Sequence, residues 1–146
     1  MKINSESTML AFGKEFGRQL FSHPSNLTNA PIIIELIGDV GTGKTTFTRG
    51  LASGLNIKEQ ITSPSFTISK SYAFLAPDGS PCALTHYDFY RLEDPGLMAD
   101  DLSEKLTPKN LIVIEWGESI KNLLPKNHTI INFDLLDDGS REVTIS

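Results

Sequence analysis

The chain carries the stretch Gly38-Asp39-Val40-Gly41-Thr42-Gly43-Lys44-Thr45, which fits the pattern G-x-x-x-x-G-K-[ST] of a phosphate-binding loop. The glycines let the backbone turn tightly, so that its N–H groups point at phosphate oxygens. Lys44 is predicted to reach the β- and γ-phosphates of a nucleotide, and the Thr45 hydroxyl to bind Mg²⁺. Each of these residue types therefore has a chemical task at its position in the loop.

The segments on either side of this loop are of the kinds that it requires. Residues Pro31–Ile37 form a β-branched apolar run, which predicts a buried strand. From Lys44 to about Leu55 the pattern predicts a helix, with Phe47 and Leu51 on its apolar face. The N-terminus of that helix carries a partial positive charge, which favours a bound phosphate. The order of strand, loop and helix favours a phosphate site over a glycine-rich turn that fits the pattern by chance.

The rest of the chain alternates between helical and strand patterns. Helices are predicted over about Ser5–Leu20 and Leu97–Leu106 and briefly after Trp116, and strands over about Phe66–Tyr72, Cys82–Asp88, Leu111–Ile114, His128–Leu135 and Arg141–Ile145. Turn signals at Pro77–Gly79 and Asp137–Ser140 each separate two antiparallel strands. The predicted fold class is α/β: a P-loop NTPase-like, three-layer domain with a largely parallel central sheet and antiparallel edge strands.

The size and composition of the chain limit its class. At 146 residues it is expected to form a single domain, 1–146, that is long enough to bury a core. Its net charge of −5 disfavours direct gripping of a nucleic-acid backbone, so any nucleic-acid role is expected to be indirect. The single cysteine, Cys82, excludes an intramolecular disulfide and is predicted to be a small buried strand residue. Without an apolar leader or spanning segment, the chain is predicted to be cytoplasmic and not bound to a membrane.

Two acidic residues stand where predicted strands end, and hydrolysis of a nucleotide needs such groups to bind Mg²⁺ and to position water. Glu115 directly follows the buried run Leu111–Ile114, and Asp88 ends the strand that begins at about Cys82. Carboxylate oxygens suit Mg²⁺, and strand ends beside a phosphate-binding loop are well placed to supply them. Glu115 and Asp88 are therefore the predicted acids of the site.

Several other residues leave two interpretations open. His86 is predicted to be a hydrogen-bonded structural histidine rather than a base or ligand, because no cysteine or histidine lies at metal-binding spacing from it. Trp116 either packs in the core or lies beside a nucleotide. Arg91 and Arg141 either bind phosphate or lie on the surface. Asp39 is predicted to shape the loop, because an inward carboxylate would repel phosphate.

Taken together, these motifs resemble those of the bacterial TsaE (YjeE-type) P-loop ATPases of tRNA threonylcarbamoyladenosine (t6A) biosynthesis. The resemblance covers nearly the whole chain. It rests on Gly38–Phe47, Ser63–Thr67 with Tyr72, His86–Leu92, Glu115-Trp116 and Gly139–Arg141, in this order and with these spacings. The phosphate-binding loop is common to many nucleotide-binding proteins, whereas the ordered set is far more specific.

The resemblance implies a role for each matched position. It implies that ATP or ADP is held by the loop and the start of its helix, that is by Gly38, Asp39, Val40, Gly41, Thr42, Gly43, Lys44, Thr45 and Thr46. Trp116 and Arg141 are implied to lie beside the nucleotide. Thr45 and Glu115 are implied to bind Mg²⁺. Asp88 is implied to support hydrolysis through the metal or the attacking water, which makes Asp88, Lys44 and Glu115 the implied catalytic residues. The segment Ser63–Thr67 is implied to be a switch that senses the γ-phosphate.

The family resemblance also implies partners. Family members act with TsaD and TsaB, which transfer the threonylcarbamoyl group to adenosine 37 of tRNA, and ATP hydrolysis by the TsaE-type subunit resets that complex between turnovers. The chain is thus expected to meet tRNA only through the complex, which suits its negative charge.

Two alternatives remain open at this point. A small-molecule kinase shares the loop but needs an acceptor pocket and usually an arginine-rich lid, and the arginines of this chain are scattered. A nucleotide-binding docking module with little hydrolysis is the other alternative. A GTPase switch is disfavoured, because the chain lacks an Asn/Thr-Lys-x-Asp motif that would read guanine.

Overall fold

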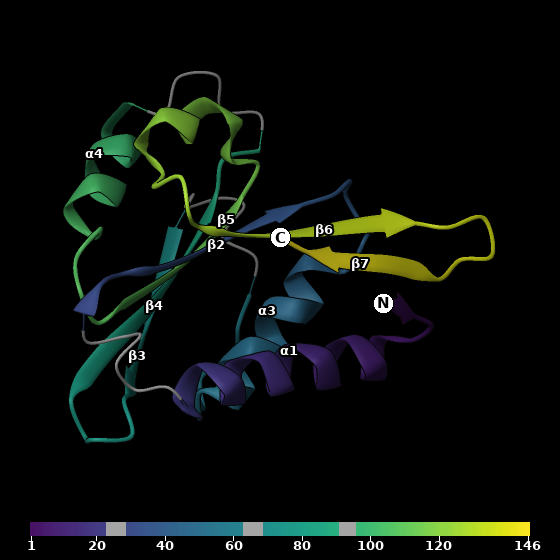
Figure 1. The fold of residues 1–146 in the computed structure, drawn as a ribbon, viewed down its shortest axis with the longest axis horizontal. Coiled ribbons are helices and arrows are strands. Elements are labelled where there is room, and N and C mark those ends of the chain that lie inside the picture. Colours follow the sequence, from purple (N-terminus) through teal and green to yellow (C-terminus); the bar gives the residue numbers. More distant parts are fainter. Residues whose placement is uncertain (23–28, 63–68, 91–95) are drawn as a thin grey trace.

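A twisted sheet forms the middle layer of the protein, and helices cover both of its faces (Figure 1). The computed structural model describes residues 1–22, 29–62, 69–90 and 96–146. Within these ranges the elements in chain order are β1 (Lys2–Ile3), α1 (Glu6–Ser22), β2 (Ile32–Ile37), α3 (Lys44–Gly54), β3 (Ser69–Leu75), β4 (Pro81–Asp88), α4 (Gly96–Glu104), β5 (Asn110–Glu115), the 3₁₀ helix η1 (Gly117–Leu123), β6 (Thr129–Leu135) and β7 (Arg141–Ile145).

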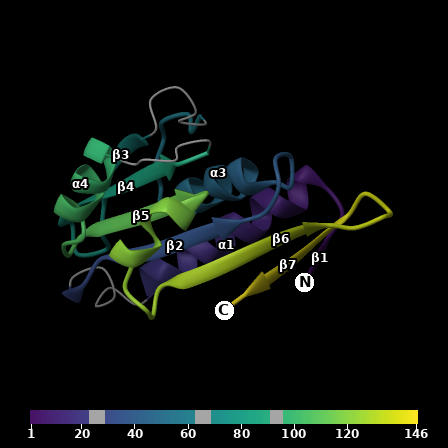
Figure 2. The same cartoon turned by 90° about the horizontal axis from the view of Figure 1, so that it is seen from above.

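Strands β2, β4, β5 and β6 form the parallel centre of the sheet. The described strands have the order β1-β7-β6-β2-β5-β4-β3, which can be followed from above in Figure 2. β2 pairs in parallel with both β5 and β6, and β4 pairs in parallel with β5. The outer pairs β3–β4, β6–β7 and β1–β7 are antiparallel. The predicted fold class, with a largely parallel centre and antiparallel edges, is confirmed.

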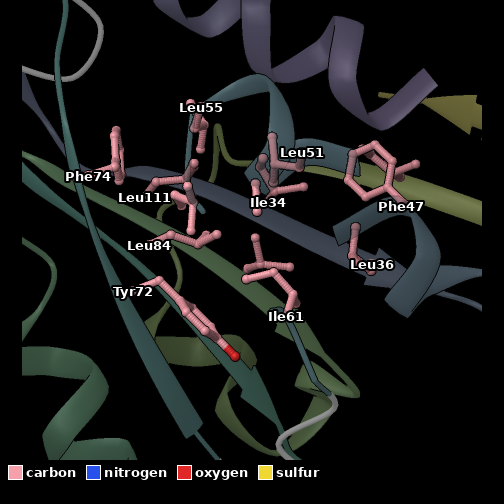
Figure 3. Close-up of a cluster of buried hydrophobic side chains, with 14 of the residues drawn as sticks. Ile34, Leu36, Phe47, Leu51, Leu55, Ile61, Tyr72, Phe74, Leu84 and Leu111 are labelled. Atoms are coloured by element: carbon pink, nitrogen blue, oxygen red, sulfur yellow. The ribbon is translucent and has the colours of Figure 1, made fainter. Parts of the chain in front are cut away.

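The two faces of the sheet bury separate hydrophobic cores. On one face, Ile34 and Leu36 of β2 pack in a cluster with Phe47 and Leu51 of α3 (Figure 3). On the other face, Ile33 of β2 packs in a cluster with residues of β5, α4 and η1, among them Ile112, Ile114, Leu102 and Ile120. Because successive strand residues point to opposite faces, the uninterrupted apolar run of β2 supplies both cores.

Helices α1 and α3 approach each other so closely that their backbones touch. Gly13 and Gly17 of α1 face Gly50 and Gly54 of α3. A Cβ atom at Gly50 would lie 2.3 Å from the carbonyl oxygen of Leu10, so only glycine leaves room for this approach. The spacing G-x-x-x-G in both helices is the sequence signal of the contact, which the apolar periodicity alone did not reveal.

Most element bounds agree with the predictions within a few residues. The cap of α1 is Ser5, whose Oγ accepts the Thr8 N–H at 3.1 Å. β3 extends to Leu75, and residues 66–68 of the predicted strand lie outside the described residues. The short strand β1 was not predicted, because it forms only by long-range pairing with β7.

No helix in the described part of the chain is long and apolar enough to cross a membrane.

Cys82 is a buried free cysteine on β4, as the sequence predicted. Burial raises the pKa of its thiol, so the thiol remains protonated and is a poor nucleophile. The side chain accordingly serves as a small core residue of the cluster that α3 covers.

The close contact between α1 and α3 yields a stability prediction. Gly50→Ala is expected to lower the free energy of unfolding by about 2 kcal/mol, because a backbone overlap of about 3 kcal/mol outweighs a gain of about 1 kcal/mol in helix propensity. Ser53→Ala, an exposed change on the same helix, is the matched control and is expected to stay within about 0.5 kcal/mol. Urea unfolding measures both. A Gly50→Ala protein as stable as the control would contradict the packing described here.

Candidate functional site

The phosphate-binding loop joins β2 to α3 and takes a conformation that its glycines permit. Gly41 and Gly43 have φ angles of 83° and 105°, a region that other residues enter only with strain. Gly43 is also the residue before the first turn of α3, and a Cβ there would lie 2.9 Å from Met9 Cε. The loop is closed by Thr42, whose Oγ1 donates to the Asp39 carbonyl at 2.8 Å. Asp39 thus shapes the loop through its backbone, in line with the expectation from the sequence.

Lys44 is the buried cation at the centre of the site. Its ammonium group donates to the carbonyl oxygens of Gly38 at 2.6 Å and Asp39 at 2.8 Å, so the loop holds its own lysine in place. The ammonium also lies 5.2 Å from the centroid of the Trp116 ring. Burial lowers the pKa of Lys44, and the nearby carboxylates of Glu115 and Asp88 oppose that shift.

The two predicted acids stand side by side at the carboxyl ends of adjacent strands. Asp88 of β4 is the register partner of Glu115 of β5, and the Phe89 N–H donates to the Glu115 carbonyl at 3.0 Å. Asp88 Oδ1 accepts the Tyr90 N–H at 2.9 Å. Burial raises the pKa of Asp88, and the negative charge of Glu115 raises it further. Both carboxylates are therefore held where a cation would relieve their burial and mutual repulsion.

One cavity of about 610 Å³ brings these groups together. Its lining includes ten of the predicted site residues: Val40, Gly41, Gly43, Lys44, Thr45, Thr46, Asp88, Glu115, Trp116 and Arg141. The other three, Gly38, Asp39 and Thr42, do not line it and instead supply loop carbonyls and a closing hydrogen bond. Ser5, Glu6, Met9 and Tyr90 also line the cavity and were not predicted. Ser5, Glu6 and Met9 reach the cavity because α1 packs on α3, although these two helices are far apart in the sequence.

Trp116 is the turning point between β5 and η1. It has a left-handed backbone conformation with φ 56° and ψ 48°, which is uncommon for a large residue and turns the chain at the strand end. Its ring contacts that of Tyr90, with 4.8 Å between the centroids, and packs against the core beneath α4. Trp116 thus borders the core, which was one of its two interpretations, and it also lines the cavity.

Arg141, the first residue of β7, reaches the phosphate-binding loop. Its Nη2 donates to the Gly41 carbonyl at 3.2 Å, and its Nη1 donates to the Gly139 carbonyl at 3.0 Å. Arg141 also lines the cavity. Arg91 and the predicted switch Ser63–Thr67 lie outside the described residues.

The prediction for His86 was wrong in its hydrogen bonding. The side chain is fully buried, but neither ring nitrogen has a hydrogen-bond partner among the described residues. The nearest carboxylate is that of Glu115, with 3.7 Å between Nε2 and Oε2. The sequence showed only that a histidine lies near the end of a strand. Which side chain lies next to it depends on the pairing of β4 with β5.

The donor set of the cavity suits Mg²⁺. Thr45, Asp88 and Glu115 offer hydroxyl and carboxylate oxygens, the hard ligands that this ion prefers. Glu115 Oε1 is buried without a hydrogen-bond partner, as expected of an acceptor whose partner is an ion or its water. The described residues contain no cluster of three His, Cys, Asp or Glu side chains fit to hold a metal.

The fold and the cavity define a P-loop NTPase-like protein, with the loop between a central strand and the helix that follows it. The crystal structure of Bacillus subtilis YdiB is similar to it, with a TM-score of 0.73 and 29% sequence identity. The similarity covers 99% of this chain and 82% of that chain.

Sequence comparisons give the narrower assignment. The family model described as threonylcarbamoyl adenosine biosynthesis protein TsaE matches residues 3–143. The chain is 33% identical over 138 residues to the tRNA threonylcarbamoyladenosine biosynthesis protein TsaE of Haemophilus influenzae, covering 94% of this chain and 82% of that protein. It is 40% identical over 140 residues to the protein of the same name from Streptomyces coelicolor, covering 91% and 88%, respectively. The chain belongs to the TsaE family, as its motifs indicated.

The half-buried carboxylate of Asp88 yields a prediction on pH and stability. Asp88→Asn is expected to stabilise the ligand-free protein at neutral pH, because burial makes the ionised carboxylate unfavourable in the folded state. The amide oxygen can still accept the Tyr90 N–H. The side chain is partly exposed, so the gain is expected to be below about 1 kcal/mol.

The sign of the pH dependence follows from the raised pKa. Below the ordinary value of 3.8, Asp88 is protonated in both the folded and unfolded states, so the variant has no advantage. The advantage grows as the pH rises through the shifted pKa. Urea unfolding of both proteins between about pH 3 and about pH 7 measures the difference. A variant that is less stable than the wild type at neutral pH would refute this account of Asp88.

Proposed function

We propose that this chain is the Mg²⁺-dependent, ATP-binding and ATP-hydrolysing subunit of the apparatus that makes threonylcarbamoyladenosine in tRNA, acting with TsaB- and TsaD-type partners. The observation that carries the proposal is the convergence of Lys44, Asp88 and Glu115 on one cavity beside a phosphate-binding loop. The biosynthetic role rests on membership of the TsaE family. Because tRNA modification takes place where tRNA is used, we also propose a cytoplasmic location.

The residues of the loop are proposed to bind the phosphates of ATP. Backbone N–H groups at the start of α3 favour anions, and Lys44 stands at that helix end. In the ligand-free protein the Lys44 ammonium is bonded to two carbonyls of its own loop. Phosphate oxygens are stronger acceptors for a cation than these carbonyls, so we propose that nucleotide binding draws the ammonium toward the phosphates.

The acids are proposed to complete the reaction site. Thr45, Glu115 and Asp88 are the residues that would hold Mg²⁺, which when bound supplies charge stabilisation to the β- and γ-phosphates. Asp88 is fixed at Oδ1 by the Tyr90 N–H, and we propose that its carboxylate also orients the attacking water. Arg141 and Trp116 are proposed to border the nucleotide, since both line the cavity.

The contact with tRNA is proposed to be indirect. The chain has a net charge of −5, whereas proteins that bind a nucleic-acid backbone tightly present a basic surface. A partner that supplies the tRNA-binding surface would leave this chain to bind and hydrolyse ATP. The retention of Lys44 by its own loop favours slow hydrolysis in isolation, so we propose that partners stimulate the reaction.

Nucleotide binding can be tested with the chain alone. Trp116 is the only tryptophan and lies over Lys44, so ADP with Mg²⁺ is expected to change its fluorescence. A titration gives the affinity. Lys44→Ala is expected to weaken binding about tenfold or more through loss of a charged contact, whereas Lys126→Ala, an exposed lysine outside the cavity, is expected to bind as the wild type does. Equal binding by both variants would exclude the assigned role of Lys44.

The biosynthetic role is tested by multiple-turnover transfer of the threonylcarbamoyl group from threonylcarbamoyl-adenylate to tRNA, with TsaB, TsaD and ATP present. The wild-type chain is expected to support repeated turnover, and Glu115→Ala to lower ATP hydrolysis about 100-fold or more. Glu118→Ala removes an exposed acid outside the cavity and is the matched control.

The outcomes of this assay separate the candidate functions. Turnover that needs the chain but not Glu115 would favour a docking module that binds nucleotide without functional hydrolysis. Turnover that is indifferent to the chain would refute the proposed function. In that case, transfer of phosphate from ATP to small-molecule acceptors would become the activity to measure.

A further inference from the structure

His86 lies directly behind the acids of the cavity without lining it. It is on β4, two residues before Asp88, and its register partner on β5 is Val113, two residues before Glu115. Residues two apart on a strand share a face, so His86, Asp88 and Glu115 all point to the face of the sheet that α3 covers. The imidazole is fully buried and is absent from the lining of the cavity. It therefore cannot touch a ligand there and can act only through its neighbours.

The pair formed by His86 and Glu115 is unsatisfied. In the described part of the chain, the buried side-chain atoms without a hydrogen-bond partner are His86 Nδ1, His86 Nε2 and Glu115 Oε1. Nε2 and Glu115 Oε2 are 3.7 Å apart, just beyond hydrogen-bond distance. Buried polar groups are costly when unpaired, and proteins keep such groups mainly at functional sites. All three atoms lie together, next to the cavity, which points to one cause.

A second histidine–carboxylate pair in the same protein shows the contrast. His128 Nε2 lies 2.7 Å from Glu35 Oε2, and His128 Nδ1 lies 2.7 Å from the Pro125 carbonyl oxygen. Both ring nitrogens of His128 are thus satisfied, and none of these residues lines the cavity. The pair away from the cavity is therefore fully hydrogen-bonded, whereas the pair next to the cavity is open.

We infer that His86 is a positioning residue for Glu115: when Mg²⁺ and nucleotide bind, the gap of 3.7 Å between Nε2 and Oε2 closes, and the Nε2–H then donates to the Glu115 carboxylate and leaves Oε1 free for the ion. The inference rests on the proposed function, in which Glu115 holds that ion. The backbone of Glu115 is already fixed by β2 and β4, so the direction of its carboxylate depends on side-chain torsions alone. A hydrogen bond from behind fixes those torsions, as partners of metal ligands commonly do.

The test measures ADP binding by calorimetry, once with excess Mg²⁺ and once with EDTA, for the wild type and two variants. His86→Leu removes the donor at similar volume, and His86→Gln retains an N–H near the position of Nε2. For His86→Leu the enhancement of ADP affinity by Mg²⁺ is expected to fall about tenfold, with affinity in EDTA unchanged. His86→Gln is expected to recover part of the enhancement. His128→Gln is the matched control and is expected to keep it in full.

Stability distinguishes positioning from a structural role. His86→Leu replaces unpaired buried polar atoms by apolar ones, so it is expected to be at least as stable as the wild type in the absence of ligand. A structural histidine would instead lose stability and leave the Mg²⁺ enhancement intact. A His86→Leu protein with full enhancement of ADP binding would overturn the inference.

A measurement on the wild type covers the case in which the variants fail to fold. In ¹⁵N NMR spectra of the ADP complex, the ring nitrogen signals of His86 are expected to shift when Mg²⁺ replaces EDTA. They are assigned by replacing the other two histidines of the chain, His23 and His128, with Asn. Unchanged ring signals would refute the inference. If Mg²⁺ does not enhance ADP binding to the wild type at all, the proposed role of Glu115 fails first, so the two failures are distinguishable.

Discussion

The parallel pairing of β5 with both β2 and β4 is the constraint on which the site depends. In a parallel sheet the carboxyl ends of neighbouring strands meet at one edge, and here that edge holds the phosphate-binding loop after β2, Glu115 at the end of β5 and Asp88 at the end of β4. None of these strands could supply the chemistry alone. The order β2-β5-β4 places the phosphate-binding loop and two acids around one cavity.

The contact between α1 and α3 is the second support of the site. Glycines on both helices let the backbones meet, and this brings the start of α1 to the cavity that α3 opens. Met9 of α1 then packs against Gly43, and α3 is held from the side opposite the sheet. The loop between β2 and α3 is therefore supported at both of its ends.

The electrostatics of the cavity are arranged for a ligand that brings both charges. Lys44 is buried with its ammonium bonded to loop carbonyls, while Asp88 and Glu115 lie side by side with a raised pKa at Asp88. Phosphate would satisfy the lysine and Mg²⁺ the acids. A nucleotide–Mg²⁺ complex supplies both, which gives a physical reason for the unfavourable burial of these groups in the ligand-free protein.

The local sequence was sufficient to predict the phosphate-binding loop, the buried strands β2 and β5, the helix α3 and the acids at the strand ends. The signals for these features, such as apolar periodicity and turn residues, extend over only a few neighbouring positions. The family followed from the order of its motifs. Contacts between distant residues needed the fold. Arg141 meets Gly41 across 100 positions, Ser5 and Met9 reach the cavity through helix packing, and β1 exists only because β7 is beside it. The open pair of His86 and Glu115 is also a contact that only the fold reveals. Its two residues come from β4 and β5, and the sequence of one strand does not show which side chain of the other strand lies next to it.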